Sequence, residues 1–396
     1  MTSTVRPHPH HRTRVPMPWH EARSVAHRLP VPISAETVPL EQAGGRTLAE
    51  PVHAAVMLPG FDNAAMDGYA TCGFGPWRVT GRVLAGEQPA TGLLSGEAAE
   101  IATGAPVPSG ADRVVEYEIT TRHGDIVSAQ PGPRRHVRRH GEYVTAGQQL
   151  LPAGHLLTPA ALGLAASVGV DAVAVRAVPR VTMLITGDEV IDHGLPGPGQ
   201  VRDAIGPMLT GLLASWHIPT TRLRVPDQPA GALTAALTSA LAAADITVVC
   251  GSSSVGPADH LHAALNAAAA TVYVDGVACR PGHPQLLART GDRWIVGVPG
   301  NPFAALVASF TLLQPLLAGL AGRALPQSPS AVVCGDARPA AGHTRLIPVR
   351  LHQHLAHPID GAHPGYLGPA ASADALAVIP PTWRPGQRTE LLGISS

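Results

Sequence analysis

Strand-like and helix-like runs alternate regularly between residue 181 and about residue 324. Short runs rich in β-branched residues lie at 181–185, 222–225, 246–249 and 295–298. Runs with helical spacing of apolar residues follow them, at 203–216, 230–243 and 303–320. This alternation is typical of a parallel sheet with helices on both faces. We therefore predict a doubly wound α/β domain over residues 181–324.

The remaining segments have shorter and more irregular elements. Residues 51–139 carry brief β-type runs between Gly/Pro turns, and residues 329–396 have the same character. Helical runs are expected from Trp19, over 39–49 and over 158–167. We predict four further parts of the chain: a flexible tail over 1–16, an N-terminal arm domain from 17–50 and 140–180, an inserted β-rich domain over 51–139, and a C-terminal β-domain over 329–396.

Two strand-to-helix corners in the α/β domain indicate a ligand site. The run that ends at Cys250 meets a Gly/Ser loop from Gly251 to Gly256, and the run that ends at Val298 meets Pro299 and Gly300. Asn301 is a suitable N-cap and Pro302 suits the first helical position. Helix N-termini offer backbone N–H groups to anions, and parallel strands share a crevice at their carboxyl ends. A Gly/Ser loop by itself is as well explained by a tight turn.

Composition narrows the function. The 396 residues include 28 basic and 28 acidic residues. Non-specific nucleic-acid binding requires an excess of basic residues, so this balance argues against it. The four cysteines show no CxxC spacing, which argues against a zinc knuckle or a disulfide scaffold and favours a cytoplasmic protein. No signal peptide is visible, and no run approaches the ~20 apolar residues that span a bilayer, so no membrane contact is expected. The chain contains no lysine.

Four further stretches combine carboxylates, cations and turn residues. They are GFDNAAMDGYA (60–70), IATGAPVPSGAD (101–112), RRHGE (138–142) and ITGDEV (185–190). Each stretch alone contains only the residue types that are common in turns. Together and in this order, with SVGPAD and GVPGNPFAAL, they resemble the molybdopterin molybdenumtransferase family, which includes the bacterial enzyme and the E domain of gephyrin. The resemblance runs from about Trp19 to the C-terminus.

This resemblance implies a function and an assembly. Family members are elongated homodimers of four domains per chain, with an active site between the α/β domain and the partner chain. Their reaction lets molybdate displace AMP from adenylylated molybdopterin, with a divalent cation such as Mg²⁺. We therefore expect adenylylated molybdopterin and molybdate as binding partners and Mg²⁺ as cofactor.

The matched motifs also imply site residues. Functional carboxylates of the family fall on Asp67, Glu189, Asp227 and Asp259, and hard oxygen ligands of this kind suit Mg²⁺. We expect metal contacts from Asp67, Glu189 and Asp259. Substrate contacts are expected from eleven residues: Thr103, Arg138, Gly251, Ser252, Ser254, Gly256, Arg280, His283, Pro299, Asn301 and Pro302.

The chain departs from the family pattern at several of these positions. Ser252 replaces a glycine and His283 replaces a lysine. Tyr143 stands where the family has an aspartate, and Ile205 where it has an asparagine. A serine-rich segment near the C-terminus is reduced to YLGPAASA. These changes leave open a second reading, a diverged paralogue that binds a pterin nucleotide or scaffolds a partner without catalysis. A third reading, the adenylyltransferase that prepares the substrate, shares only the α/β domain.

Overall fold

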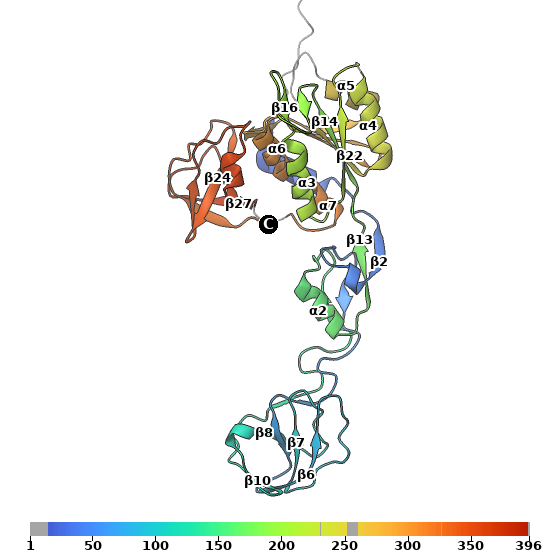
Figure 1. Ribbon diagram of the computed structural model, residues 1–396, viewed down its shortest axis with the longest axis vertical. Coiled ribbons are helices and arrows are strands. Elements are labelled where there is room, and N and C mark those ends of the chain that lie inside the picture. Colours follow the sequence, from blue (N-terminus) through green and yellow to red (C-terminus); the bar gives the residue numbers. More distant parts are fainter. Residues whose placement is uncertain (1–14, 230, 252–259, 326, 395–396) are drawn as a thin grey trace, which may run out of the picture. The chain divides into compact units, whose positions relative to one another are not determined.

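The computed structural model describes residues 15–229, 231–251, 260–325 and 327–394 (Figure 1). Contacts divide the chain into two compact units. Unit 1 combines the residues up to Glu36 with those from Arg176 onward, and unit 2 holds Thr37–Val175. Each unit has hydrophobic cores of its own.

A six-stranded sheet forms the centre of unit 1. Its strand order is β17 (Thr220–Val225), β14 (Val181–Thr186), β18 (Ile246–Cys250), β22 (Arg293–Val298), β21 (Leu286–Thr290), β19 (Thr271–Asp275). The first four strands are parallel, and β21 and β19 are antiparallel additions. Every residue of β14 and β18 is buried, as expected for strands covered on both faces.

Helices cover both faces of this sheet. Residues of α1 (Trp19–Arg28), α3 (Ile205–Ser215), α6 (Pro302–Ala308) and α7 (Gln314–Leu320) share one core with the sheet. Residues of α4 (Ala232–Ala243) and α5 (His260–Ala267) belong to a second core. The predicted doubly wound α/β domain is therefore confirmed.

The long helix expected over 303–320 is interrupted in its middle. A π-helical turn, Ser309–Leu313, separates α6 from α7. Pro315 explains the interruption, because proline has no N–H for the carbonyl of residue i−4 and its ring crowds that carbonyl. By length and composition Pro302–Leu320 can cross a membrane, so the statement that no run approaches this length was wrong. The segment is a core helix, since 94% of its apolar window is buried.

The C-terminal β-structure recruits strands from distant parts of the chain. Its sheet order is β1 (Met17–Pro18), β20 (Val277–Arg280), β24 (Thr344–His352), β25 (Leu355–Pro358), β23 (Ser330–Val333), β27 (Arg388–Gly393), β26 (Ala375–Ile379). An additional pairing of β26 with β24 closes five of these strands on themselves. The short helix α8 (Gly368–Ala371) belongs to the same region. The sequence did not predict the contribution of β1 and β20.

Helix α1 packs in unit 1, whereas the sequence assigned it to the arm domain. The Trp19 Nε1–H donates to Thr311 Oγ1 at 3.0 Å, and the Arg23 guanidinium lies over the Trp19 ring while donating to the Phe310 carbonyl. Both partners belong to the π-helical turn. The apolar face of α1 is thus buried against the long helix of the α/β domain.

Unit 2 contains the β-rich domain and the remainder of the arm. Its main sheet has the order β8 (Arg113–Glu116), β5 (Gly68–Thr71), β7 (Glu97–Ile101), β6 (Trp77–Val83), β10 (Ile126–Ser128), β9 (Thr121–His123). Three two-stranded ladders accompany it: β11 (Val137–Arg138) with β4 (Asn63–Ala64), β12 (Gln149–Leu151) with β3 (Val52–His53), and β13 (Ala172–Arg176) with β2 (Ala35–Pro39).

The helices of unit 2 agree with the sequence in one case and differ in another. Helix α2 (Pro159–Ser167) begins where Thr158 caps it, as its Oγ1 accepts from the Ala161 N–H. The short helix that was expected to end at the paired glycines Gly44 and Gly45 is only a 3₁₀ turn, Leu40–Gln42. The left-handed backbone of Gly45, with φ +73°, follows this turn and stops helical propagation. A second 3₁₀ turn lies at Tyr117–Ile119.

Candidate functional site

A cavity of about 530 Å³ lies at the carboxyl ends of the parallel strands in unit 1. The loops after β14 and β17 contribute Glu189 and Asp227 to its lining. Gly251 follows β18, and Asn301 follows β22. Its size falls within the range of small-molecule sites, and its position is the usual ligand position of open α/β sheets.

The ends of β14, β18 and β22 are fastened together beneath this cavity. The Thr186 hydroxyl donates to the Cys250 carbonyl at 2.8 Å, and the Gly251 N–H donates to the Val298 carbonyl at 3.1 Å. Gly251 has φ +105°, and a Cβ there would lie 2.8 Å from Thr186 Oγ1. This turn therefore requires glycine, which lets backbone rather than side chain form the cavity floor.

The two acidic loops after β14 and β17 hold each other by reciprocal hydrogen bonds. The Asp227 N–H donates to Asp188 Oδ1 at 2.9 Å, and the Asp188 N–H donates to Asp227 Oδ2 at 3.3 Å. Each carboxylate keeps a second oxygen that these two bonds do not use. The adjacent Glu189 carboxylate folds over Gly187, where a Cβ would meet Glu189 Oε2 at 2.5 Å. Among the described residues, the Glu189 carboxylate makes no hydrogen bond or ion pair, so it is available to a ligand in the cavity.

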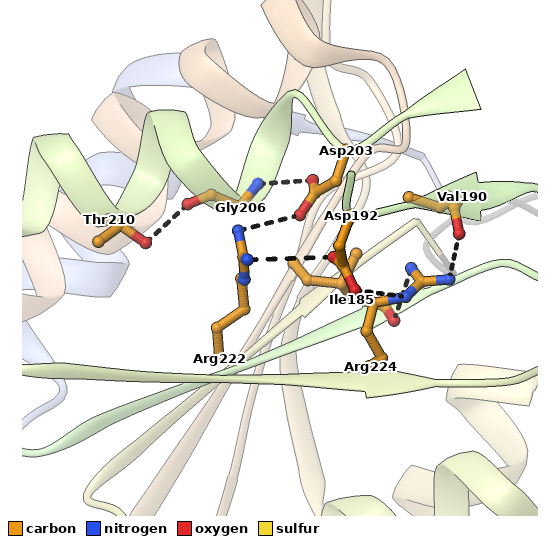
Figure 2. A network of polar contacts seen from close by, with 8 residues as sticks. All are labelled: Ile185, Val190, Asp192, Asp203, Gly206, Thr210, Arg222 and Arg224. Atoms are coloured by element: carbon orange, nitrogen blue, oxygen red, sulfur yellow. Dashed lines mark hydrogen bonds and ion pairs between the residues drawn. The ribbon is translucent and has the colours of Figure 1, made fainter. Parts of the chain in front are cut away.

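A chain of alternating charges supports the same loop from the side (Figure 2). Arg222 lies between Asp203, at 3.5 Å, and Asp192, at 4.0 Å. Asp203 lines the cavity and its Oδ1 accepts from the Gly206 N–H at 2.8 Å, which fixes the start of α3. Arg224 completes the chain, with Nε 3.9 Å from Asp192 Oδ2.

At the corner of Asn301 and Pro302, a loop of the C-terminal region occupies the first N–H donors of the helix. Asn301 and Pro302 occupy the N-cap and first helical positions, but the Asn301 side chain makes no capping hydrogen bond. The Phe303 and Ala304 N–H groups donate to the Pro364 carbonyl, at 2.9 and 3.4 Å. Pro302 has no N–H, so a loop of the C-terminal region already satisfies the first donors of α6. The Phe303 and Ala304 N–H groups are therefore occupied, while Asn301 and Pro302 themselves line the cavity and stay predictions as substrate contacts.

The remaining predicted substrate residues of unit 1 lie away from the cavity lining. Pro299 is buried, while Arg280 and His283 are exposed and none of the three lines the cavity. The His283 Nδ1 donates to the Val277 carbonyl at 3.0 Å.

Unit 2 brings two predicted residues into direct contact. The Thr103 N–H donates to Asp67 Oδ1 at 2.6 Å, and this bond holds the pKa of the Asp67 carboxyl below its usual value. Ladder hydrogen bonds join their two motifs, from Gly104 to Ala64 and from Ala64 to Ala105. The motifs GFDNAAMDGYA and IATGAPVPSGAD thus form one surface.

Arg138 and a neighbouring carboxylate complete this surface. Arg138 pairs with Asn63 between β11 and β4, and its guanidinium makes no ion pair among the described residues. Next to it, the His140 N–H donates to Asp62 Oδ1 at 2.8 Å and Arg139 forms an ion pair with Oδ2. The His140 bond, followed by the Arg139 contacts, lowers the pKa of the Asp62 carboxyl.

The donor set suits a hard cation only in part. Glu189 and Asp227 offer oxygen atoms to the cavity, which fits Mg²⁺. In the part of the chain that is described, no three His, Cys, Asp or Glu side chains gather closely enough to hold a metal. Asp67 belongs to unit 2. The predicted residues Ser252, Ser254, Gly256 and Asp259 lie outside the described residues.

Sequence reasoning missed several residues that the structure places at the cavity. Thr186, His260 and Gly365 all line it. Thr186 ends a strand, and strand ends were a usable signal. Gly365 comes from the C-terminal region, and no local pattern indicated that its loop meets the N-terminus of α6.

Comparisons with known proteins agree with this arrangement. Residues 17–169 match the family described as "MoeA N-terminal region (domain I and II)", and residues 182–319 match "Probable molybdopterin binding domain". The chain is similar to the molybdopterin molybdenumtransferase of Haemophilus influenzae, with 33% identity over 81% of this chain and 83% of that one. The corresponding protein of a Nostoc species is 36% identical over 73% of this chain and 70% of its own.

Solved structures show the same likeness. A molybdopterin biosynthesis MoeA protein from Pyrococcus matches with a TM-score of 0.77 and 27% identity, covering 96% of this chain and 100% of that chain. A second structure, from Pyrococcus horikoshii, has a TM-score of 0.81 at 24% identity. At this identity the likeness supports the fold and nothing further.

Proposed function

This chain belongs to the molybdopterin molybdenumtransferase family, and on that premise we propose that it inserts molybdate into adenylylated molybdopterin with release of AMP. The resemblance inferred from the motifs is thereby confirmed. The relatives carry the name of an enzyme of molybdenum cofactor biosynthesis, so the comparisons do not favour the alternative of a non-catalytic paralogue.

One observation carries the proposal. All lining residues of the cavity except Gly365 lie in the region that matches the molybdopterin-binding family, and they include Glu189 and Asp227. A pyrophosphate-linked substrate needs a cation and hydrogen-bond donors near its phosphates. Mg²⁺ bound to these carboxylates would polarise the phosphoanhydride and offset the charge on the departing AMP.

The residues of this chain have separate tasks in that reaction. Gly251 keeps side chains away from the cavity floor, so a phosphate can approach the backbone there. The Asp188–Asp227 pair fixes the two acidic loops relative to each other. Asp259 and Asp67 stay predictions as further ligands, as do Thr103 and Arg138 as substrate contacts. We also propose, from the family resemblance, a homodimer in the cytoplasm.

The test uses purified protein with adenylylated molybdopterin, molybdate and Mg²⁺. Molybdate-dependent release of AMP is expected, together with active cofactor that reconstitutes a cofactor-free molybdoenzyme. The variant Asp227→Asn keeps an oxygen for the Asp188 N–H but removes the charge, and it should lower turnover at least tenfold. Asp292→Asn is the matched control, because Asp292 is 96% exposed and pairs only with Arg289 among the described residues. Binding of the nucleotide without AMP release would refute the proposal.

A further inference from the structure

The side chain of Arg224 converges on the backbone of the loop that carries Glu189. Its Nη2 donates to the carbonyls of Gly187 and Val190, at 2.8 and 2.6 Å, and its Nη1 donates to the Ile185 carbonyl at 3.4 Å. Figure 2 shows the guanidinium directed at Ile185 and Val190. Two of these carbonyls belong to residues on either side of Glu189.

The position of Arg224 makes this arrangement informative. Strand β17 is the edge of the sheet, where a long cation can extend into water. The side chain instead turns inward and is only 29% exposed, which costs solvation and side-chain entropy. Three carbonyls and the Asp192 carboxylate compensate for that cost. Holding a half-buried cation against one particular loop indicates that the geometry of this loop matters.

The loop has little support from its own backbone hydrogen bonds. Gly187 has φ +111°, and the segment from Gly187 to Glu189 has few ladder bonds, since β15 (Val190–Ile191) begins only after it. A planar guanidinium can bind several carbonyls at once in a fixed geometry. Without it, the carbonyls of Gly187 and Val190 lose charge-assisted partners, and the backbone on either side of Glu189 is held less firmly.

We propose that Arg224 is a positioning residue for the transfer reaction, which holds the Glu189 loop in the geometry that receives the cation and the substrate phosphates. The inference rests on the proposed function for its kinetic consequence. Its structural part, the hold of Arg224 on residues 185–190, is independent of that function. Arg222, two residues earlier on the strand, contacts carboxylates and none of the three carbonyls.

The kinetic experiment compares Arg224→Gln, Arg224→Lys and the control Arg180→Gln. Arg180 pairs with Asp245 at the opposite end of the sheet. For Arg224→Gln we expect kcat/KM for adenylylated molybdopterin to fall about 10- to 100-fold, as is common for residues that orient metal ligands. The Mg²⁺ concentration for half-maximal rate should rise about tenfold. Arg224→Lys keeps the charge and should recover part of the loss, whereas Arg180→Gln should match the wild type.

A second measurement needs no turnover. Hydrogen exchange followed by mass spectrometry should show faster exchange of the peptide around residues 187–192 in Arg224→Gln, with unchanged exchange in β18 and β22. The inference is overturned if that peptide exchanges at the wild-type rate, or if an active wild type and Arg224→Gln share the same kcat/KM and Mg²⁺ dependence. A wild type without AMP release would refute the proposed function, while the exchange data would still decide whether Arg224 holds the loop.

Discussion

Gly319, in α7, tests whether the packing of α1 against the long helix is as close as the structure shows. A Cβ at this position would lie 2.3 Å from the His27 carbonyl oxygen and 2.6 Å from Pro30 Cγ. Contacts below 3.0 Å essentially do not occur, so the backbones must separate by about 0.7 Å (3.0 − 2.3). Gly211, in α3, is the matched control, because a Cβ there meets nothing within 4 Å.

Two effects of opposite sign compete in Gly319→Ala. Alanine in a helix is favoured over glycine by about 1 kcal/mol, while overpacking a buried contact costs about 1–3 kcal/mol. The obstacle is a backbone carbonyl that cannot rotate away, so the steric cost should prevail and the variant should be destabilised by up to about 2 kcal/mol. Gly211→Ala has only the favourable effect and should be stabilised by about 0.5–1 kcal/mol.

Thermal unfolding followed by tryptophan fluorescence measures the difference, since Trp19, Trp216 and Trp294 all report on unit 1. About 2–4 °C per kcal/mol is expected for a unit of this size, so the Tm values of the two variants should differ by several degrees. If the Tm of Gly319→Ala equals or exceeds that of Gly211→Ala, then α1 and α7 do not pack as closely as the structure shows.

Two further predictions concern titratable groups. The depressed pKa of Asp62 contributes stability that is fully present above its unfolded pKa of about 4 and lost as the pH falls through the folded pKa. Asp62→Asn should therefore have a lower Tm than the wild type at pH 6, and the difference should shrink as the pH falls below about 4. Burial raises the pKa of Cys279 to about 12 and also raises that of Cys250. A thiol reagent should therefore label Cys72 and Cys334 quickly in the native protein, and all four thiols only after unfolding; rapid native labelling of Cys250 would contradict its burial.

Local pattern was sufficient to predict much of the α/β domain. The strand expected at 181–185 is Val181–Thr186, and the helix expected at 230–243 is Ala232–Ala243. These elements have long apolar runs, so the sequence marks them strongly. The two-residue strand Met17–Pro18 and the strand Val277–Arg280 are too short for any periodicity, and their pairing is set by tertiary contacts.

The site was less accessible to sequence reasoning. Glu189 and Asp227 were named because the motifs that carry the family resemblance place functional carboxylates there, and the structure puts both at the carboxyl ends of parallel strands. The blocked donors of α6 were missed because their acceptor, Pro364, lies some sixty residues later in the chain. Arg224 was treated as part of an ordinary strand, since nothing local indicates that its side chain turns toward the loop after β14.

The core shared by α1, α7 and the C-terminal strands has a consequence for protein engineering. Trp19, Leu316 and Leu376 belong to the same cluster of buried side chains, although they come from three separate segments of the chain. A chimera joined between residues 324 and 329, where the sequence suggests a clean border, would therefore cut through a continuous core. Exchange of the C-terminal β-structure between relatives should succeed only when α1 and strand β1 are exchanged with it.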